Sequence, residues 1–113
     1  MKLDIIEAIS FSKALGSFIK KRLLSKEDFE SFKKFLADNP EIGDMIPGTG
    51  GTRKIRLKGF STGKSGGFRV CYYYLIENSL YLLLIYAKNE QENLTTDEKK
   101  QLRTLVKTLK GKI

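Results

Sequence analysis

The chain has 113 residues, of which 41% are hydrophobic and 30% charged, and its formal net charge is +8. This length suits one domain, residues 1–113, that buries roughly two thirds of its unfolded surface, and the apolar fraction excludes a disordered chain. One cysteine excludes an internal disulfide, no histidine is present for acid–base or metal chemistry, and no apolar run approaches the ~20 residues of a membrane helix.

The N-terminal part of the chain predicts a short strand followed by two helices. Residues 2–8 are compatible with an edge strand, and apolar residues recur at helical spacing over residues 11–19. Ser25 is a suitable N-cap for a second helix. Asn39-Pro40 ends that helix, because the residue before a proline is pushed out of the helical region. We predict an αα-hairpin whose phenylalanines cover the apolar face of a sheet.

Three strands are predicted between residues 47 and 88. They span residues 53–57, 68–75 and 80–87, and each run is short, rich in β-branched or aromatic residues, and bounded by Gly or Asn. Consecutive strands of this kind favour antiparallel pairing.

A last helix is predicted after the third strand. Thr95 and Glu98 have the spacing of a capping box, and an apolar stripe follows that suits packing on the sheet or its edge. The predicted fold is therefore α+β. A small antiparallel sheet, made of three C-terminal strands and an N-terminal edge strand, is packed by the N-terminal αα-hairpin and the C-terminal helix.

Alternation along the strands separates an apolar face from a basic face. In the first strand Lys54 and Arg56 point to one face, and Ile55 and Leu57 to the other. The second strand contributes to the apolar face Phe68, Val70, Tyr72 and Tyr74, and to the basic face Arg69, Cys71, Tyr73 and Leu75. Most of the aromatic residues are therefore interpreted as core, and Tyr73 is the one expected to stand beside Arg69.

Positive charge is concentrated on this sheet. Between residues 50 and 88 there is one acidic residue, Glu77, against seven basic residues, which are Arg53, Lys54, Arg56, Lys58, Lys64, Arg69 and Lys88. Residues before position 50 carry eight of each sign. Such concentration is typical of a site for a polyanion. Arg53 and Lys58 also fit simple solvated charges, whereas Lys54, Arg56 and Arg69 converge on one face of adjacent strands.

The glycine-rich segment 59–65 has some of the residues of a nucleotide-binding P-loop. Only three residues separate its glycines where four are needed, and a strand follows instead of the helix that would hold phosphate. We interpret it as a hairpin connection whose Lys64 contacts a polyanion. No cluster of Cys or paired acids has a metal-ligand spacing, so neither a metal nor a small-molecule cofactor is expected.

Four segments resemble the RelE/HigB toxin superfamily, and most closely its HigB-like branch. They are NPEIGD (39–44), IPGTGGTRKIR (46–56), GKSGGFRV (63–70) with Tyr72-Tyr73 after it, and IYAKNE (85–90). The resemblance implies a RelE-like fold and a toxin of a type II toxin–antitoxin pair, neutralised by a cognate antitoxin. It also implies cleavage of mRNA in the decoding site of the 30S ribosomal subunit, without a metal. The ribose 2′-hydroxyl attacks the adjacent phosphate and leaves a 2′,3′-cyclic phosphate.

The resemblance also implies the residues of the site. Lys54 and Arg56 match the basic strand pair of the superfamily, Arg69 its central-strand arginine, and Lys88 the base at the end of the last strand. Arg69 is expected to hold the scissile phosphate, Arg56 to share the developing charge, and Lys54 to act as general base. Lys88 either protonates the leaving oxygen or holds the RNA backbone. Further RNA contacts are expected from Arg53, Lys58, Lys64 and Tyr73.

The chain departs from the superfamily pattern at two places. Many relatives carry a tyrosine or histidine near the start of the last helix, where residues 92–96 have neither, and Asn89 replaces an arginine. These departures keep open a second hypothesis, a non-catalytic RNA- or ribosome-binding module. A plain protein-interaction domain makes poor use of the concentrated charge. An unprocessed cytoplasmic protein is expected, because no signal-peptide pattern follows Met1.

Overall fold

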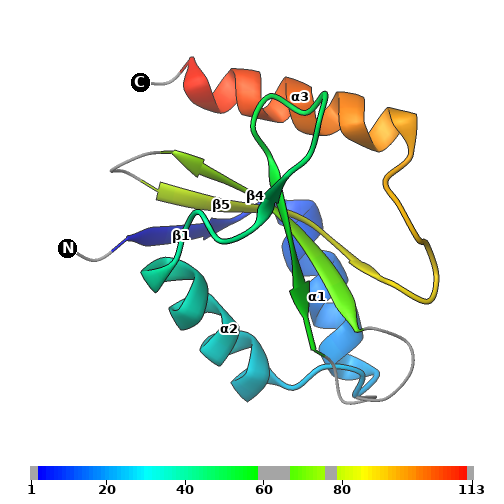
Figure 1. Cartoon of the computed structure of the whole chain (residues 1–113). Coiled ribbons are helices and arrows are strands. Elements are labelled where there is room, and N and C mark those ends of the chain that lie inside the picture. The colour runs from blue at the N-terminus through cyan, green and yellow to red at the C-terminus, as the bar shows by residue number, and fades with distance from the viewer. Residues whose placement is uncertain (1–2, 59–66, 76–78, 112–113) are drawn as a thin grey trace.

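The chain folds into one sheet with three helices, seen in a computed structural model that describes residues 3–58, 67–75 and 79–111 (Figure 1). The elements in chain order are β1 (Asp4–Glu7), α1 (Ile9–Lys20), α2 (Lys26–Asp38), β2 (Asp44–Met45), β3 (Arg53–Leu57), β4 (Phe68–Leu75), β5 (Ser79–Ala87) and α3 (Thr96–Lys110). The three predicted strands and the predicted helices are confirmed. The hairpin connection predicted at 59–65 lies outside the described residues.

The five strands follow the order β1-β5-β4-β3-β2. Three pairs are antiparallel: β2 with β3, β3 with β4, and β4 with β5. The fourth pair, β1 with β5, is parallel. The α+β class and the N-terminal edge strand are confirmed, but the sheet is mixed, and the two-residue strand β2 was not predicted. Alternation assigns side chains to faces and carries no signal for the direction of a neighbouring strand.

Helices α1 and α2 cover one face of the sheet, which confirms the predicted αα-hairpin (Figure 1). The rings of Phe18 and Phe68, for example, have centroids 4.7 Å apart across this interface. The helical layer contributes six buried residues to this first core: Phe11, Leu15, Leu24, Phe29, Phe32 and Leu36. The sheet contributes eight: Leu57, Phe68, Val70, Tyr72, Leu80, Leu82, Ile85 and Ala87.

Helix α3 packs on the opposite face and forms a second core (Figure 1). That core buries Ile46, Cys71, Tyr73, Leu75, Leu83, Tyr86, Leu102 and Val106. The face interpreted above as basic is therefore half covered, because the apolar stripe of α3 buries the Cys71–Leu75 half of β4. The part of this face that carries Arg56 and Arg69 is called the open face below.

Two predicted helix caps hold the connections in place. Ser25 Oγ accepts a hydrogen bond of 2.9 Å from the backbone N–H of Asp28. At the start of α3, Thr95 Oγ1 accepts from the Glu98 N–H at 3.0 Å, and Glu98 Oε1 accepts from the Thr95 N–H at 2.9 Å. This capping box is the one predicted, and it fixes the segment that leads from β5 into α3.

Candidate functional site

Arg56 and Arg69 lie directly opposite each other on β3 and β4. Their neighbours Leu57 and Phe68 are also paired and are buried in the first core, so alternation directs both arginines to the open face. Arg56 is exposed and Arg69 is half-buried. Like charges directly opposite each other destabilise a sheet, so this pair favours an anion between or beside the two guanidinium groups.

A groove of about 430 Å³ runs along the outer side of β3 beyond the end of β2. We call it the edge groove. Its lining residues are Phe35, Ile42, Gly43, Asp44, Lys54, Ile55, Arg56 and Arg69. Three cations thus meet one acid, and Phe35 and Ile42 supply apolar surface that is about half exposed, at 45% and 48%. A groove of this composition suits a phosphate with an organic group attached.

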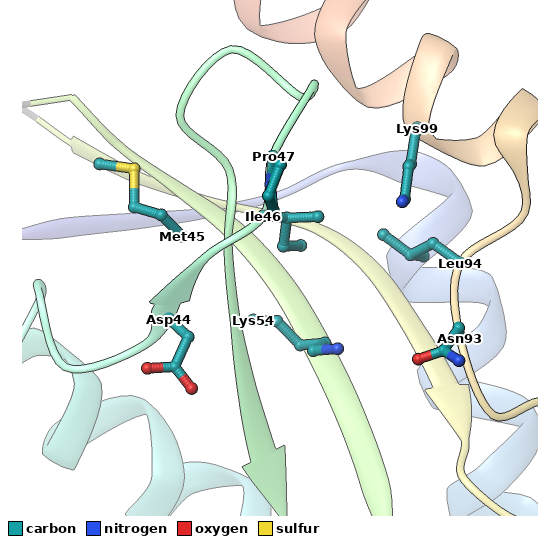
Figure 2. Close-up of a pocket in the computed structure, with 8 residues that line it drawn as sticks. All are labelled: Asp44, Met45, Ile46, Pro47, Lys54, Asn93, Leu94 and Lys99. Atoms are coloured by element: carbon teal, nitrogen blue, oxygen red, sulfur yellow. The ribbon is translucent and has the colours of Figure 1, made fainter.

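A second groove, of about 400 Å³, lies between the β2–β3 region and the start of α3, and we call it the inner groove (Figure 2). Its residues are Asp44, Met45, Ile46, Pro47 and Lys54 on one side and Asn93, Leu94 and Lys99 on the other. Figure 2 shows the Lys54 amine directed across the groove toward Asn93. Lys54 lines both grooves and therefore joins them into one cationic surface.

The positive groups of this surface are not neutralised by the nearest acid. Asp44 is the cross-strand partner of Lys54, yet its carboxylate points away from the Lys54 amine (Figure 2). Among residues 3–58, 67–75 and 79–111, no ion pair is formed by Lys54 or Arg56. Their charges are available to a ligand.

Lys88 is placed differently from the other three predicted catalytic residues. It follows β5 directly, its backbone N–H donates to the Gly67 carbonyl at 3.0 Å, and its Nζ donates to the Glu92 carbonyl at 2.9 Å. It lines neither the edge groove nor the inner groove. Lys88 thus holds the connection that continues into Asn93, one wall of the inner groove.

Tyr72 and Arg53 hold the segment that leads into the opposite wall. Tyr72 Oη donates to the Pro40 carbonyl and accepts from the Gly43 N–H, both at 2.9 Å, and burial raises the pKa of this phenol. Arg53 Nη1 donates to the carbonyls of Glu41 and Gly43 at 2.8 Å. A Cβ atom on Gly43 would lie 2.8 Å from the Tyr72 ring, so only glycine allows this close approach. Arg53 is therefore held by hydrogen bonds to two backbone carbonyls and is not a simple solvated charge.

The remaining predicted RNA contacts are dispersed. Lys58 is exposed immediately after β3, at the end nearer Arg56. Tyr73 lies in the second core with 8% of its surface exposed, opposite Tyr81, so its ring is not on the open face beside Arg69. Lys64 lies outside the described residues. The structure thus brings Lys54, Arg56 and Arg69 together, whereas Lys58 follows the end of β3 and Tyr73 is buried in the second core.

Cys71 lies beneath this surface as the cross-strand partner of Lys54. It is fully buried, and burial raises the pKa of its thiol to about 12, although the charge of Lys54 acts in the opposite direction. A thiol in that state is neutral at physiological pH and is not a nucleophile. The chemistry of the site therefore belongs to the amine and guanidinium groups.

The three lining residues on the α3 side of the inner groove were not identified as site residues from the sequence: Asn93, Leu94 and Lys99. No local pattern marks them, because their approach to Lys54 depends on the packing of α3 against the sheet. In the described part of the chain, no group of three or more His, Cys, Asp or Glu side chains is placed to hold a metal ion. No described helix has the length and apolar character needed to cross a membrane.

The fold and the grooves together define a small α+β domain with a cationic surface suited to a polyanion. A family model described as the RelE toxin of the RelE/RelB toxin–antitoxin system matches residues 42–112, well over half of the chain. The chain therefore belongs to the RelE toxin family. Members of this family are toxins paired with an antitoxin, and they are generally endoribonucleases that cleave mRNA and inhibit translation. The superfamily resemblance is confirmed, and the HigB-like branch stays a prediction.

Proposed function

We propose that this protein is a ribosome-dependent mRNA endoribonuclease that acts without a metal ion. The single observation that carries the proposal is the cross-strand pair of Arg56 and Arg69, joined through Lys54 to two grooves. Preorganised cations aimed at a phosphate stabilise the charge of a phosphoryl transition state, which is usually the largest catalytic contribution. Both grooves are open surfaces, which supports an external template, the ribosome, for holding the RNA.

In the proposed reaction the 2′-oxygen of a ribose attacks the adjacent phosphorus. Lys54 takes the proton of the 2′-hydroxyl as general base, and the bond from phosphorus to the 5′-oxygen breaks as the 2′-oxygen bonds to phosphorus. The 5′-oxygen leaves with a proton from water, and a 2′,3′-cyclic phosphate remains. Arg69 holds two phosphate oxygens through its planar fork, and Arg56 shares the developing negative charge.

Lys88 takes a supporting role in this proposal. Its Nζ is bonded to the Glu92 carbonyl, so the ammonium group stabilises the connection beside Asn93. Protonation of the leaving oxygen by Lys88 would require that bond to be released. We therefore propose that Lys88 maintains the shape of the inner groove by holding the connection beside Asn93.

The antitoxin is proposed to cover the same cationic surface. The protein carries a net charge of +8, and seven basic residues fall between residues 50 and 88. A neutralising segment rich in Asp and Glu would complement Arg56 and Arg69 and exclude RNA from both grooves.

The experiment expresses the protein under tight control in growing bacteria and maps 5′ ends on a translated mRNA and on an untranslated copy. Cuts inside codons of the translated copy alone are the expected result. Arg69→Ala and Lys54→Met should each lower cleavage by roughly a hundredfold, the usual effect of removing a preorganised charge-stabilising group or a general base. Lys20→Ala, at an exposed position of α1, removes the same charge from the other side of the sheet and should leave cleavage unchanged. Full activity in both groove variants would contradict the assignment.

A second candidate function is a non-catalytic ribosome-binding module on the same scaffold. The connection into α3 favours it, because Asn93, Leu94 and Thr95 provide no acid or base to the inner groove. The same experiment separates the two functions. Growth arrest without cuts supports binding alone, whereas cuts inside codons support the nuclease.

A further inference from the structure

Tyr86 carries a polar group that the structure leaves without a partner. Only 6% of its surface is exposed. Among the described residues, its hydroxyl is the one buried side-chain nitrogen or oxygen atom that makes no hydrogen bond. Buried polar groups are almost always satisfied, because an unpaired one lowers stability. By contrast, the hydroxyl of Tyr72 in the adjacent strand makes two hydrogen bonds. The sheet can therefore satisfy a buried phenol, and the unpaired hydroxyl of Tyr86 is an exception within it.

A β-bulge places Tyr86 on the face of the candidate site. The pairing of β4 with β5 shifts between Cys71 and Tyr72, whose partners are Leu84 and Leu82, so Leu83 is an extra residue. An extra residue reverses the phase of alternation. Leu80 and Leu82 before the bulge are in the first core, and Tyr86 after it faces the second core and the open face.

The bulge thereby completes a row of three side chains across the sheet. Tyr86 on β5 is the cross-strand partner of Arg69, and Arg69 is the partner of Arg56. Directly opposed side chains on one face have Cβ atoms about 5 Å apart, within reach of a hydrogen bond from a long side chain. Burial raises the pKa of the Tyr86 phenol, and Cys71 adds to this, while the positive charge of Arg69 lowers it. The phenol is therefore neutral at physiological pH and close to the Arg69 charge.

The guanidinium group of Arg69 donates a hydrogen bond to the backbone of its own strand. Its Nη1 donates to the carbonyl of the preceding residue, Phe68, at 3.2 Å. When the guanidinium turns toward a phosphate in the edge groove, its fork directs two N–H groups at the phosphate and leaves others for the protein. Glu98 Oε1 accepts hydrogen bonds from Gln91 and from the Thr95 backbone, so this carboxylate is held at the start of α3.

We propose that Tyr86 is a positioning residue for Arg69, whose hydroxyl accepts one guanidinium N–H when Arg69 binds the scissile phosphate. The unpaired hydroxyl then has a partner in the complex with RNA. The proposal rests on the proposed nuclease function, because it assigns Tyr86 to the phosphate-binding step of that reaction.

The test compares Tyr86→Phe with the unchanged protein on ribosomes that carry a short mRNA in the decoding site. The single-turnover rate of cleavage should fall roughly ten- to hundredfold, the effect of losing one hydrogen bond to a charged group. Tyr81→Phe, on the same strand and opposite Tyr73, removes an equivalent hydroxyl away from Arg69 and should leave the rate unchanged. An unchanged rate in Tyr86→Phe would overturn the proposal.

Stability separates positioning from a structural role. Tyr86→Phe removes an unpaired hydroxyl, so its unfolding midpoint should equal or exceed that of the unchanged protein, while Tyr72→Phe should lower it. A double-mutant cycle with Arg69→Lys measures the energetic coupling between Tyr86 and Arg69 in the cleavage rate. Arg69→Lys keeps the positive charge and removes the planar guanidinium fork. Tyr86→Phe should add no further loss in the Arg69→Lys background. The proposal would be contradicted if Tyr86→Phe lowered the cleavage rate in the Arg69→Lys background by the same factor as in the unchanged protein. Destabilisation by Tyr86→Phe would also contradict it.

Binding of an mRNA with a 2′-deoxyribose at the cleavage position is measured in parallel. This probe needs Arg69 but cannot be cut, so it tests the inference separately from the nuclease activity. Weaker binding by Tyr86→Phe supports the role of Tyr86, and unchanged binding overturns it. If the unchanged protein binds both mRNAs and cuts neither, the proposed function fails and the inference is judged on this binding alone.

Discussion

At the scale of single residues, the candidate site places like charges directly opposite each other in the sheet. Arg56 and Arg69 oppose each other across two strands, and Lys54 is two residues before Arg56 on the same face. Repulsion between directly opposed like charges destabilises the pairing of two strands. An anion in the edge groove relieves this repulsion, and the same charges attract RNA from solution.

Cys71 gives a prediction at this scale, because its thiol is buried in the folded state and exposed in the unfolded state. Its pKa is about 12 when folded against an ordinary 9.0, so the folded state keeps the proton over a pH range in which the unfolded state loses it. The corresponding stability is complete below pH 9.0 and is lost as the pH rises toward about 12. Between about pH 8 and about pH 10, the free energy of unfolding should fall by roughly 1.4 kcal/mol from this group.

Denaturant unfolding at the two pH values measures this effect. Cys71→Ala is the control, because it lacks the thiol and retains every tyrosine. Its stability should depend on pH less steeply than that of the unchanged protein. Equal pH dependence in both proteins would show that Cys71 is not the group responsible.

At the scale of elements, short connections shape both grooves. The Thr95–Glu98 capping box and the Lys88 bond to Glu92 hold one wall, and the Tyr72 bonds to the segment after α2 hold the other. Each wall is therefore anchored at a strand end or a helix start. Rigid elements position a site more accurately than free loops do.

Two glycines give a prediction about these elements. Gly16 is inside α1, and no atom lies within 4 Å of a Cβ added there, so its lack of a side chain serves no packing contact. Gly16→Ala should raise the free energy of unfolding by about 0.5–1 kcal/mol. Gly48 has equally open surroundings but a φ of +79°, so Gly48→Ala should lower the free energy of unfolding by about 1–2 kcal/mol.

Thermal or denaturant unfolding of the two variants checks this pair. They add the same methyl group in the same free space, so a difference in sign reports backbone conformation alone. Destabilisation by Gly16→Ala would mean that α1 has a contact at this position in solution that the structure lacks.

At the scale of the whole molecule, the two faces of the sheet have different uses. One face is covered by α1 and α2, and the other is covered by α3 over only part of its area (Figure 1). The uncovered part carries Arg56 and Arg69, with Lys54 beside them in the edge groove. RNA and the acidic antitoxin segment proposed above are therefore expected to compete for one surface.

This competition gives a prediction about the toxin–antitoxin complex. Arg69→Glu should raise the rate constant for dissociation of the antitoxin by roughly tenfold or more, because it places a carboxylate against an acidic segment. Lys20→Glu makes the same change of charge on the far side of the sheet and serves as the control. Surface plasmon resonance with the cognate antitoxin measures both. A lower dissociation rate constant for Arg69→Glu would contradict an acidic partner at this site.

Much of this arrangement was predictable from local patterns. Alternation in β3 and β4 assigned Lys54, Arg56 and Arg69 to one face, and the caps at Ser25 and Thr95 marked two helix starts that the structure confirms. Motifs of the RelE/HigB superfamily identified the family. These features depend on residues close together in the chain, where periodicity and hydrogen-bonding groups act directly.

The α+β class, the basic strand residues and the family therefore follow from local sequence patterns. Tertiary structure alone decided the parallel pairing of β1, the cover of α3 over Tyr73, and the approach of Asn93 and Lys99 to Lys54. It also decided the bulge at Leu83, which reverses the phase of β5 and brings Tyr86 beside Arg69. A bulge and a strand partner are set by packing between distant segments, and neither leaves a periodic signal in the chain.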